Sequence, residues 1–154
     1  MPLLREGGNF VYGWSIIRKD NTLYLPPKVV NEYKLEKDSD IILISGSKIS
    51  GGFCITSLKT LKSSKLSRVV ENNPDLESEE SIGQIINYRG KNYCHLKLTN
   101  DNSLILSEKI MSHFNVKNGN KLLIIKGSRI AFSCCNKGPL IRVAHESNKL
   151  IEVY

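Results

Sequence analysis

The stretch Asn21-Thr22-Leu23-Tyr24-Leu25-Pro26, continued by Ile41-Ile42-Leu43-Ile44 and Gly46-Ser47-Lys48-Ile49, decides the fold because the chain carries it twice. The second copy reads Asn102-Ser103-Leu104-Ile105-Leu106-Ser107, Leu122-Leu123-Ile124-Ile125 and Gly127-Ser128-Arg129-Ile130, at a constant offset of 81 residues. Recurrence at one fixed offset is typical of an internal duplication, and two copies are too few to bury their faces as a solenoid. We therefore expect the copies to pack against each other in one pseudo-symmetric core.

Each copy predicts the same order of elements: strand, strand, short helix, strand, strand. In the first copy, residues 11–19 and 23–25 are typical of a hairpin whose turn is Asp20-Asn21. Pro26-Pro27 ends the pairing and suits the first turn of a short helix. The unbroken apolar run at 41–44 indicates a strand buried on both sides. The fold class that follows is mainly β with short helices.

The remaining segments set the predicted boundaries within a single domain of residues 1–154. We expect repeat one at 11–57, a connector at 58–81, repeat two at 82–137 and a C-terminal hairpin at 138–154, with residues 1–10 as a lead or short edge strand. The leucines and valines of 58–70 allow one amphipathic helix in the connector. The turn of the C-terminal hairpin is predicted at 146–149.

Composition limits the protein class. The chain of 154 residues is 40% hydrophobic and 24% charged, and it has no apolar run near the roughly 18 residues that a membrane span requires. Its first residues lack the basic start and apolar stretch of a signal peptide, so we expect a cytoplasmic protein without membrane contact. The net charge of +7 permits binding to a polyanion.

Motifs for catalysis are missing from the sequence, so we expect neither an enzyme nor a cofactor. The histidines His95, His113 and His145 accompany no motif-marked nucleophile. The four cysteines, Cys54, Cys94, Cys134 and Cys135, form no CxxC pair, and three of them lie in predicted strands. Free cysteines in such places usually act as small buried hydrophobes, which is the favoured interpretation. A zinc site could alternatively be built from Cys94, His95, Cys134 and Cys135, although adjacent strand residues point to opposite faces. The favoured prediction is that no metal is bound.

The repeat resembles the swapped-hairpin family that includes AbrB, the SpoVT amino-terminal domain and the MazE antitoxins. The matching residues are Leu25-Pro26, Tyr33-Lys34-Leu35 and Asp38-Ser39 in the first copy, and Leu106-Ser107, Phe114-Asn115-Val116 and Gly119-Asn120 in the second. Members of that family usually pair two chains and interleave their hairpins into one β-barrel. The resemblance implies that this tandem chain builds a swapped-hairpin AbrB-like β-barrel alone, as a pseudo-dimer.

The resemblance also implies a function, because the family binds DNA through basic residues on the first strand, in the following loop and on the helix. The residues that match those positions are Arg18, Lys19, Lys28, Lys97 and Lys109. Other family positions are not basic here, namely Thr22, Ser103, Val30, Asn31, Met111 and Ser112. We expect a transcription regulator or antitoxin-like protein that contacts duplex DNA mainly through phosphates. Alternatively, the chain is a structural or protein-interaction module that has lost the DNA surface, and Lys28 and Lys109 are solvated lysines.

The two copies also differ in charge. Glu36 and Asp40 of the first copy align with Lys117 and Lys121 of the second. Such opposite charges could promote head-to-tail self-association, since heterologous contacts form rings or open chains. Alternatively, these are surface loops whose charges drifted independently.

Overall fold

The computed structural model describes residues 10–146 and 151–154, with nine strands and five short α-helices among them. The first half contains β1 (Val11–Ile16), β2 (Thr22–Tyr24), α1 (Pro27–Glu32), β3 (Asp40–Ser45) and β4 (Phe53–Ser57). The second half contains β6 (Lys91–Lys97), β7 (Ser103–Ile105), α4 (Glu108–His113), β8 (Lys121–Ile125) and β9 (Phe132–Cys135). The mainly β prediction is confirmed, and both halves follow the predicted order of elements.

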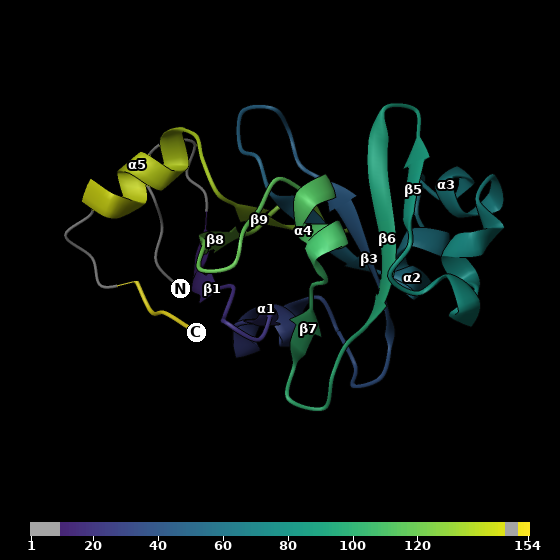
Figure 1. Cartoon of the computed structure of the whole chain (residues 1–154), viewed down its shortest axis with the longest axis horizontal. Coiled ribbons are helices and arrows are strands. Elements are labelled where there is room, and N and C mark those ends of the chain that lie inside the picture. The colour runs from purple at the N-terminus through teal and green to yellow at the C-terminus, as the bar shows by residue number, and fades with distance from the viewer. Residues whose placement is uncertain (1–9, 147–150) are drawn as a thin grey trace.

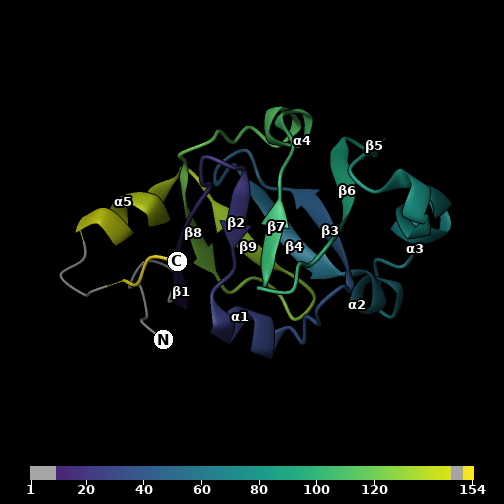
Figure 2. The same ribbon diagram turned by 60° about the horizontal axis from the view of Figure 1, so that its bottom comes forward.

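The strands form two antiparallel sheets, and in both of them strands from the first half of the chain pair with strands from the second half. The larger sheet has seven strands in the order β1-β8-β9-β4-β3-β6-β5, and β2 pairs with β7 in a two-stranded sheet. First-half β1 therefore pairs with second-half β8, and second-half β6 with first-half β3. The two-stranded sheet crosses in front of the larger one, with α1 and α4 at its two ends (Figure 2). Among the described strands, the hydrogen bonds do not close a barrel.

The two short helices that follow β2 and β7 start differently and end alike. Pro26 and Pro27 open α1 without a side-chain cap, whereas the Ser107 hydroxyl accepts a hydrogen bond from the Ile110 amide of α4 at 3.2 Å. Lys34 and Asn115 follow the helix ends with φ of 53° and 57°. In both cases the next amide donates back to the helix, which is the hydrogen bond of a Schellman motif.

Both predicted apolar runs are buried, because alternate side chains enter different clusters on the two faces of the larger sheet. Ile41 and Leu43 join the main core with Leu122 and Ile124, whereas Ile42 lies in a second cluster. The main core also contains side chains from both strands of the small sheet, so that sheet packs across one face of the large one. Each half contributes residues that the other half covers.

Different segments cover the outer parts of the larger sheet (Figure 1). At one edge, Leu58, Leu61 and Val70 of the connector pack on Ile42 and its neighbours. The connector contains α2 (Leu58–Lys62), α3 (Arg68–Glu71) and the 3-10 helices η2 (Pro74–Glu77) and η3 (Glu79–Ser81), followed by β5 (Ile85–Tyr88). The single predicted helix is thus wrong: the chain breaks it, and Leu66 between the two helices is 43% exposed.

The C-terminal hairpin prediction is also wrong, because residues 139–146 form helix α5 (Pro139–Glu146). Ala144 packs on Trp14 and Leu123, and the His145 ring stacks on the Trp14 indole at 5.1 Å. Beyond it, the chain end runs parallel to β1, where the Trp14 amide donates to the Glu152 carbonyl at 2.7 Å. Most of the predicted turn at 146–149 and of the predicted lead at 1–10 lies outside the described residues.

Candidate nucleic-acid interface

Arg18 and Lys19 lie in the loop between β1 and β2, and both are exposed. Asn21 adopts φ 67°, and the Thr22 amide donates to the Asp20 carboxylate at 3.1 Å, so the loop is a tight turn that points its side chains outward. The Arg18 guanidinium lies 4.6 Å from the centre of the Tyr24 ring. Stacking leaves the N–H donors at the edge of the guanidinium free for an anion.

Lys28 and Lys109 lie in the first turns of α1 and α4, and both are exposed. The inner faces of these helices are buried by Val29, Val30, Ile110 and Met111. Val30 and Met111 stand where the resembled family has basic residues, and here they belong to the main core. The helices therefore offer one exposed lysine each at the predicted positions.

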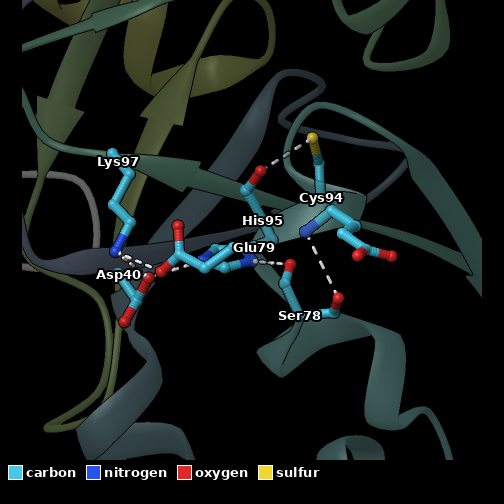
Figure 3. A network of polar contacts seen from close by, with 7 residues as sticks. Asp40, Ser78, Glu79, Cys94, His95 and Lys97 are labelled. Atoms are coloured by element: carbon cyan, nitrogen blue, oxygen red, sulfur yellow. Dashed lines mark hydrogen bonds and ion pairs between the residues drawn. The ribbon is translucent and has the colours of Figure 1, made fainter.

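Lys97 differs from the other candidates because its charge is already paired (Figure 3). Its ammonium lies 2.8 Å from Asp40 Oδ1 of β3 and 2.8 Å from Glu79 Oε1 of the connector. These hydrogen bonds to Asp40 and Glu79 raise the pKa of Lys97 to about 12. Because two carboxylates surround the Lys97 ammonium, the group as a whole has no net positive charge with which to attract a phosphate. Lys97 therefore differs from the exposed candidates.

The same network holds a buried histidine. His95, which is 1% exposed, contacts Asp40 Oδ1 through Nε2 at 2.7 Å and the Ser78 carbonyl through Nδ1 at 3.3 Å. Burial raises the pKa of the Asp40 carboxyl, but hydrogen bonds from Lys97 and His95 outweigh it and hold that pKa below its usual range. The network joins β3, β6 and the connector, so its evident role is to attach the connector to the sheet.

Lys117 and Lys121 lie near Arg18 and Lys19, because a loop from each half of the chain contacts the other at this place. The Asn118 side chain donates to the Arg18 carbonyl at 2.6 Å and to Asn21 Oδ1 at 2.9 Å. The Gly119 amide donates to the Ile17 carbonyl at 2.7 Å. Exposed Lys117 and Lys121 flank this contact. Sequence reasoning did not include them as site residues, although strand exchange between the copies would have placed them there.

Lys109 belongs to the same end of the molecule, whereas Lys28 does not. The Leu106 amide, just before α4, donates to the Asn21 carbonyl at 2.9 Å. At the opposite end the Leu25 amide, just before α1, donates to the Asn102 carbonyl at 3.0 Å. The five sequence-predicted residues are thus not brought together at one place.

The cysteines and the other histidines provide no alternative site within the described residues. Cys94 lies in β6 and Cys134 and Cys135 in β9, with β3 and β4 between those strands, so the conceivable zinc ligands are far apart. Burial raises the pKa of Cys94 to about 12 and that of Cys135 to about 11. No group of three potential metal ligands occurs in residues 10–146 and 151–154. These cysteines are buried thiols.

A scan against protein-family models found no match to the chain, and a search of curated proteins found no significant relative. In the part of the chain that the structure describes, every helix is too short or too polar to cross a membrane.

Proposed function

We propose that the chain is a swapped-hairpin protein of the AbrB-like kind, built from two copies in one chain, and that it binds duplex DNA mainly through phosphates. The exchange of strands between the halves carries this proposal, because β1 pairs with β8, β3 with β6 and β2 with β7. When two copies are related by a two-fold axis, a residue at the axis lies opposite its own counterpart in the other copy. Leu23 and Leu104, which align at the offset of the repeat, are such a pair.

Backbone geometry supports the same assignment. Left-handed residues recur at the offset of the repeat, in the pairs Asn21 and Asn102, Lys34 and Asn115, and Asp38 and Gly119. Few non-glycine residues adopt positive φ, so three aligned pairs are difficult to attribute to chance. Gly46 and Gly127 are aligned as well, and a Cβ at either would lie 2.2 Å or 2.4 Å from a loop carbonyl oxygen.

The exposed residues Arg18, Lys19, Lys28 and Lys109 are the proposed phosphate contacts. Lysine neutralises phosphates as a point charge and reads bases less specifically than an arginine fork does. We therefore propose modest affinity with little sequence preference, and regulation of transcription, alone or in an antitoxin-like role, as the biological setting. This is a binding function rather than an enzymatic one.

The paired state of Lys97 and the burial of Val30 and Met111 favour a second candidate function. In that case the chain keeps the fold as a structural or protein-interaction module that no longer binds DNA. The two functions differ in one measurable property, because only phosphate neutralisation makes binding weaken steeply with salt.

The test compares the salt dependence of duplex binding in three proteins. In one variant Arg18, Lys19, Lys28 and Lys109 are changed to alanine, and in the control Lys59, Lys65, Arg68 and Lys91 are changed instead, all of them exposed. Binding weakens with salt, so log K falls as log salt rises, and each lost phosphate contact makes this slope less steep by ~0.9. We expect the first variant to lose most of the slope and the control to keep it. Absence of salt-dependent binding by the unchanged protein would favour the interaction module.

A further inference from the structure

Five exposed cations gather at one end of the molecule, which we call the basic pole: Arg18, Lys19, Lys109, Lys117 and Lys121. They come from the β1–β2 loop, the start of α4 and the turn before β8. The contacts of Asn118 with Arg18 and Asn21 join the loop to the turn, and the Leu106 amide joins α4 to the same loop. Hydrogen bonds between the two halves of the chain therefore hold the basic pole together.

The opposite end has the same backbone contacts but a different charge. There the Asp38 amide donates to the Leu98 carbonyl at 2.9 Å, so the turn before β3 meets the β6–β7 loop. Four of the five cations of the basic pole are lost at the aligned positions of this end, and only the α1 lysine, Lys28, is retained. The replacements are Thr99, Asn100, Glu36 and Asp40.

The side-chain charges of the basic pole are also available to contact an anion. Among the described residues, no carboxylate lies within 4.0 Å of any of the five side-chain charges. Two of them are held in place by aromatic rings, Arg18 by Tyr24 and Lys121 by Trp14, each at 4.6 Å from the ring centre. Ordering a cation before binding lowers the entropic cost of the contact. At the other end, by contrast, Lys97 is held by Asp40 and Glu79.

The surface beside the basic pole is concave. A hollow of about 500 Å³ runs along α4, and Lys117, Asn118 and Ser112 line it together with Glu108, whose carboxylate would repel a phosphate placed against it. Its Ser112 hydroxyl can donate to a phosphate oxygen, whereas the two amide hydrogens of Asn118 already bond to Arg18 and Asn21.

We propose that the phosphate backbone of duplex DNA docks on the basic pole alone, so that the chain engages DNA with one half of its pseudo-symmetric surface. This inference rests on the proposed function and narrows its set of contacts, because Lys28, at the opposite end, then makes no phosphate contact. Two-fold related contacts on two half-sites match a palindromic operator. A protein that binds with one pole needs no such symmetry in its DNA.

The experiment uses two matched pairs of exposed lysines in the full chain. Lys19→Ala with Lys117→Ala changes the basic pole, and Lys28→Ala with Lys37→Ala removes the same charge from the opposite end. None of the four makes an ion pair among the described residues. Binding to a duplex without a palindrome is measured by fluorescence anisotropy at several salt concentrations, and the circular dichroism spectrum of each variant confirms its fold.

We expect the Lys19 and Lys117 variant to flatten the salt slope by about 2 units and the Lys28 and Lys37 variant to leave it unchanged. Equal flattening by both variants would show that both ends contact DNA, which overturns the one-pole inference and leaves the proposed function standing. Flattening by the Lys28 and Lys37 variant alone overturns it too. If the unchanged protein shows no salt-dependent binding to the duplex, the proposed function itself fails.

Discussion

Asp40 and Lys121 show at the scale of single residues how positions that align at the offset of 81 residues differ in charge. Asp40 contacts His95 across the β3–β6 pair, and Lys121 lies over Trp14 across the β8–β1 pair. His95 and Trp14 are themselves aligned at the repeat offset. Each charge therefore has a partner suited to it, a carboxylate with an imidazole and an ammonium with an indole. This compensation within the chain weakens the case for head-to-tail association through the same charges, which stays untested.

The Asp40 contacts predict a pH-dependent stability. The pKa of Asp40 is lower in the folded chain than its usual value, because the hydrogen bonds from Lys97 and His95 outweigh burial. Its contribution is thus fully present above the unfolded pKa near 3.9 and is lost as pH falls through the lower folded-state pKa. Asp40→Asn should lower the free energy of unfolding by about 1–2 kcal/mol at pH 7, and by much less near pH 2.

Urea denaturation at the two pH values measures this difference. Asp75→Asn is the matched control, because Asp75 is exposed in the connector and makes no ion pair among the described residues. An equal loss at pH 7 and pH 2 would mean that Asp40 acts through packing rather than through its charge.

At the scale of elements, the helix ends reveal a conflict between local sequence and fold. Lys34 and Asn115 occupy the same left-handed position after α1 and α4. Asparagine tolerates that conformation, whereas a lysine must pay a steric cost in it. Lys34 nevertheless keeps it, because the Leu35 amide bonds back to the Val30 carbonyl at 2.9 Å and both side chains are buried.

Lys34→Asn should therefore raise the free energy of unfolding by about 0.5–1 kcal/mol, because asparagine adopts the left-handed backbone conformation with less steric strain than lysine. The exchanged variant Asn115→Lys should lower it by a similar amount. Midpoints of chemical denaturation provide the measurement. If the two substitutions shift the midpoint in the same direction, the backbone conformation is not what distinguishes the two helix ends.

The sequence predicts elements well where local signals and tertiary structure agree. Pro26 and Pro27 at the start of α1 and the apolar run of β3 mark elements that the structure contains. α5 was missed because residues 146–149 were interpreted as the turn of a hairpin, and the β-branched Ile141 and Val143 before that turn are compatible with a strand. The helix is instead stabilised by packing on Trp14 and Leu123, which are more than 15 residues away in the chain.

The candidate site was predictable only in part, for a related reason. Sequence matching identifies exposed cations such as Arg18 and Lys28. It cannot show that Lys97 is held by Asp40 and Glu79, because three separate segments supply these residues. The gathering of Lys117 and Lys121 beside Arg18 likewise depends on a contact between the two halves.

At the scale of the whole molecule, neither half has its strand partners without the other. In residues 1–58, β1 would lose β8, β2 would lose β7, and β3 and β4 would each lose one neighbour, leaving only the β3–β4 pair. Much of the main core, including Leu104, Phe114 and Leu122, would be lost with them. A chain of about 60 residues is marginally stable even with a complete core of its own.

We therefore expect residues 1–58 to be unfolded when dilute and to form a homodimer at high concentration, in which β1 of each copy pairs with β3 of the other. This pairing would reproduce the β6–β3 contact of the full chain. Circular dichroism and sedimentation equilibrium over a range of concentrations test it. As a control, residues 1–81 and 82–154, mixed after separate purification, should form a one-to-one complex with the spectrum of the full chain. A folded monomer of residues 1–58 at every concentration would rule out the interleaving of the two halves as the source of stability, because that half would then hold its hairpins without a partner.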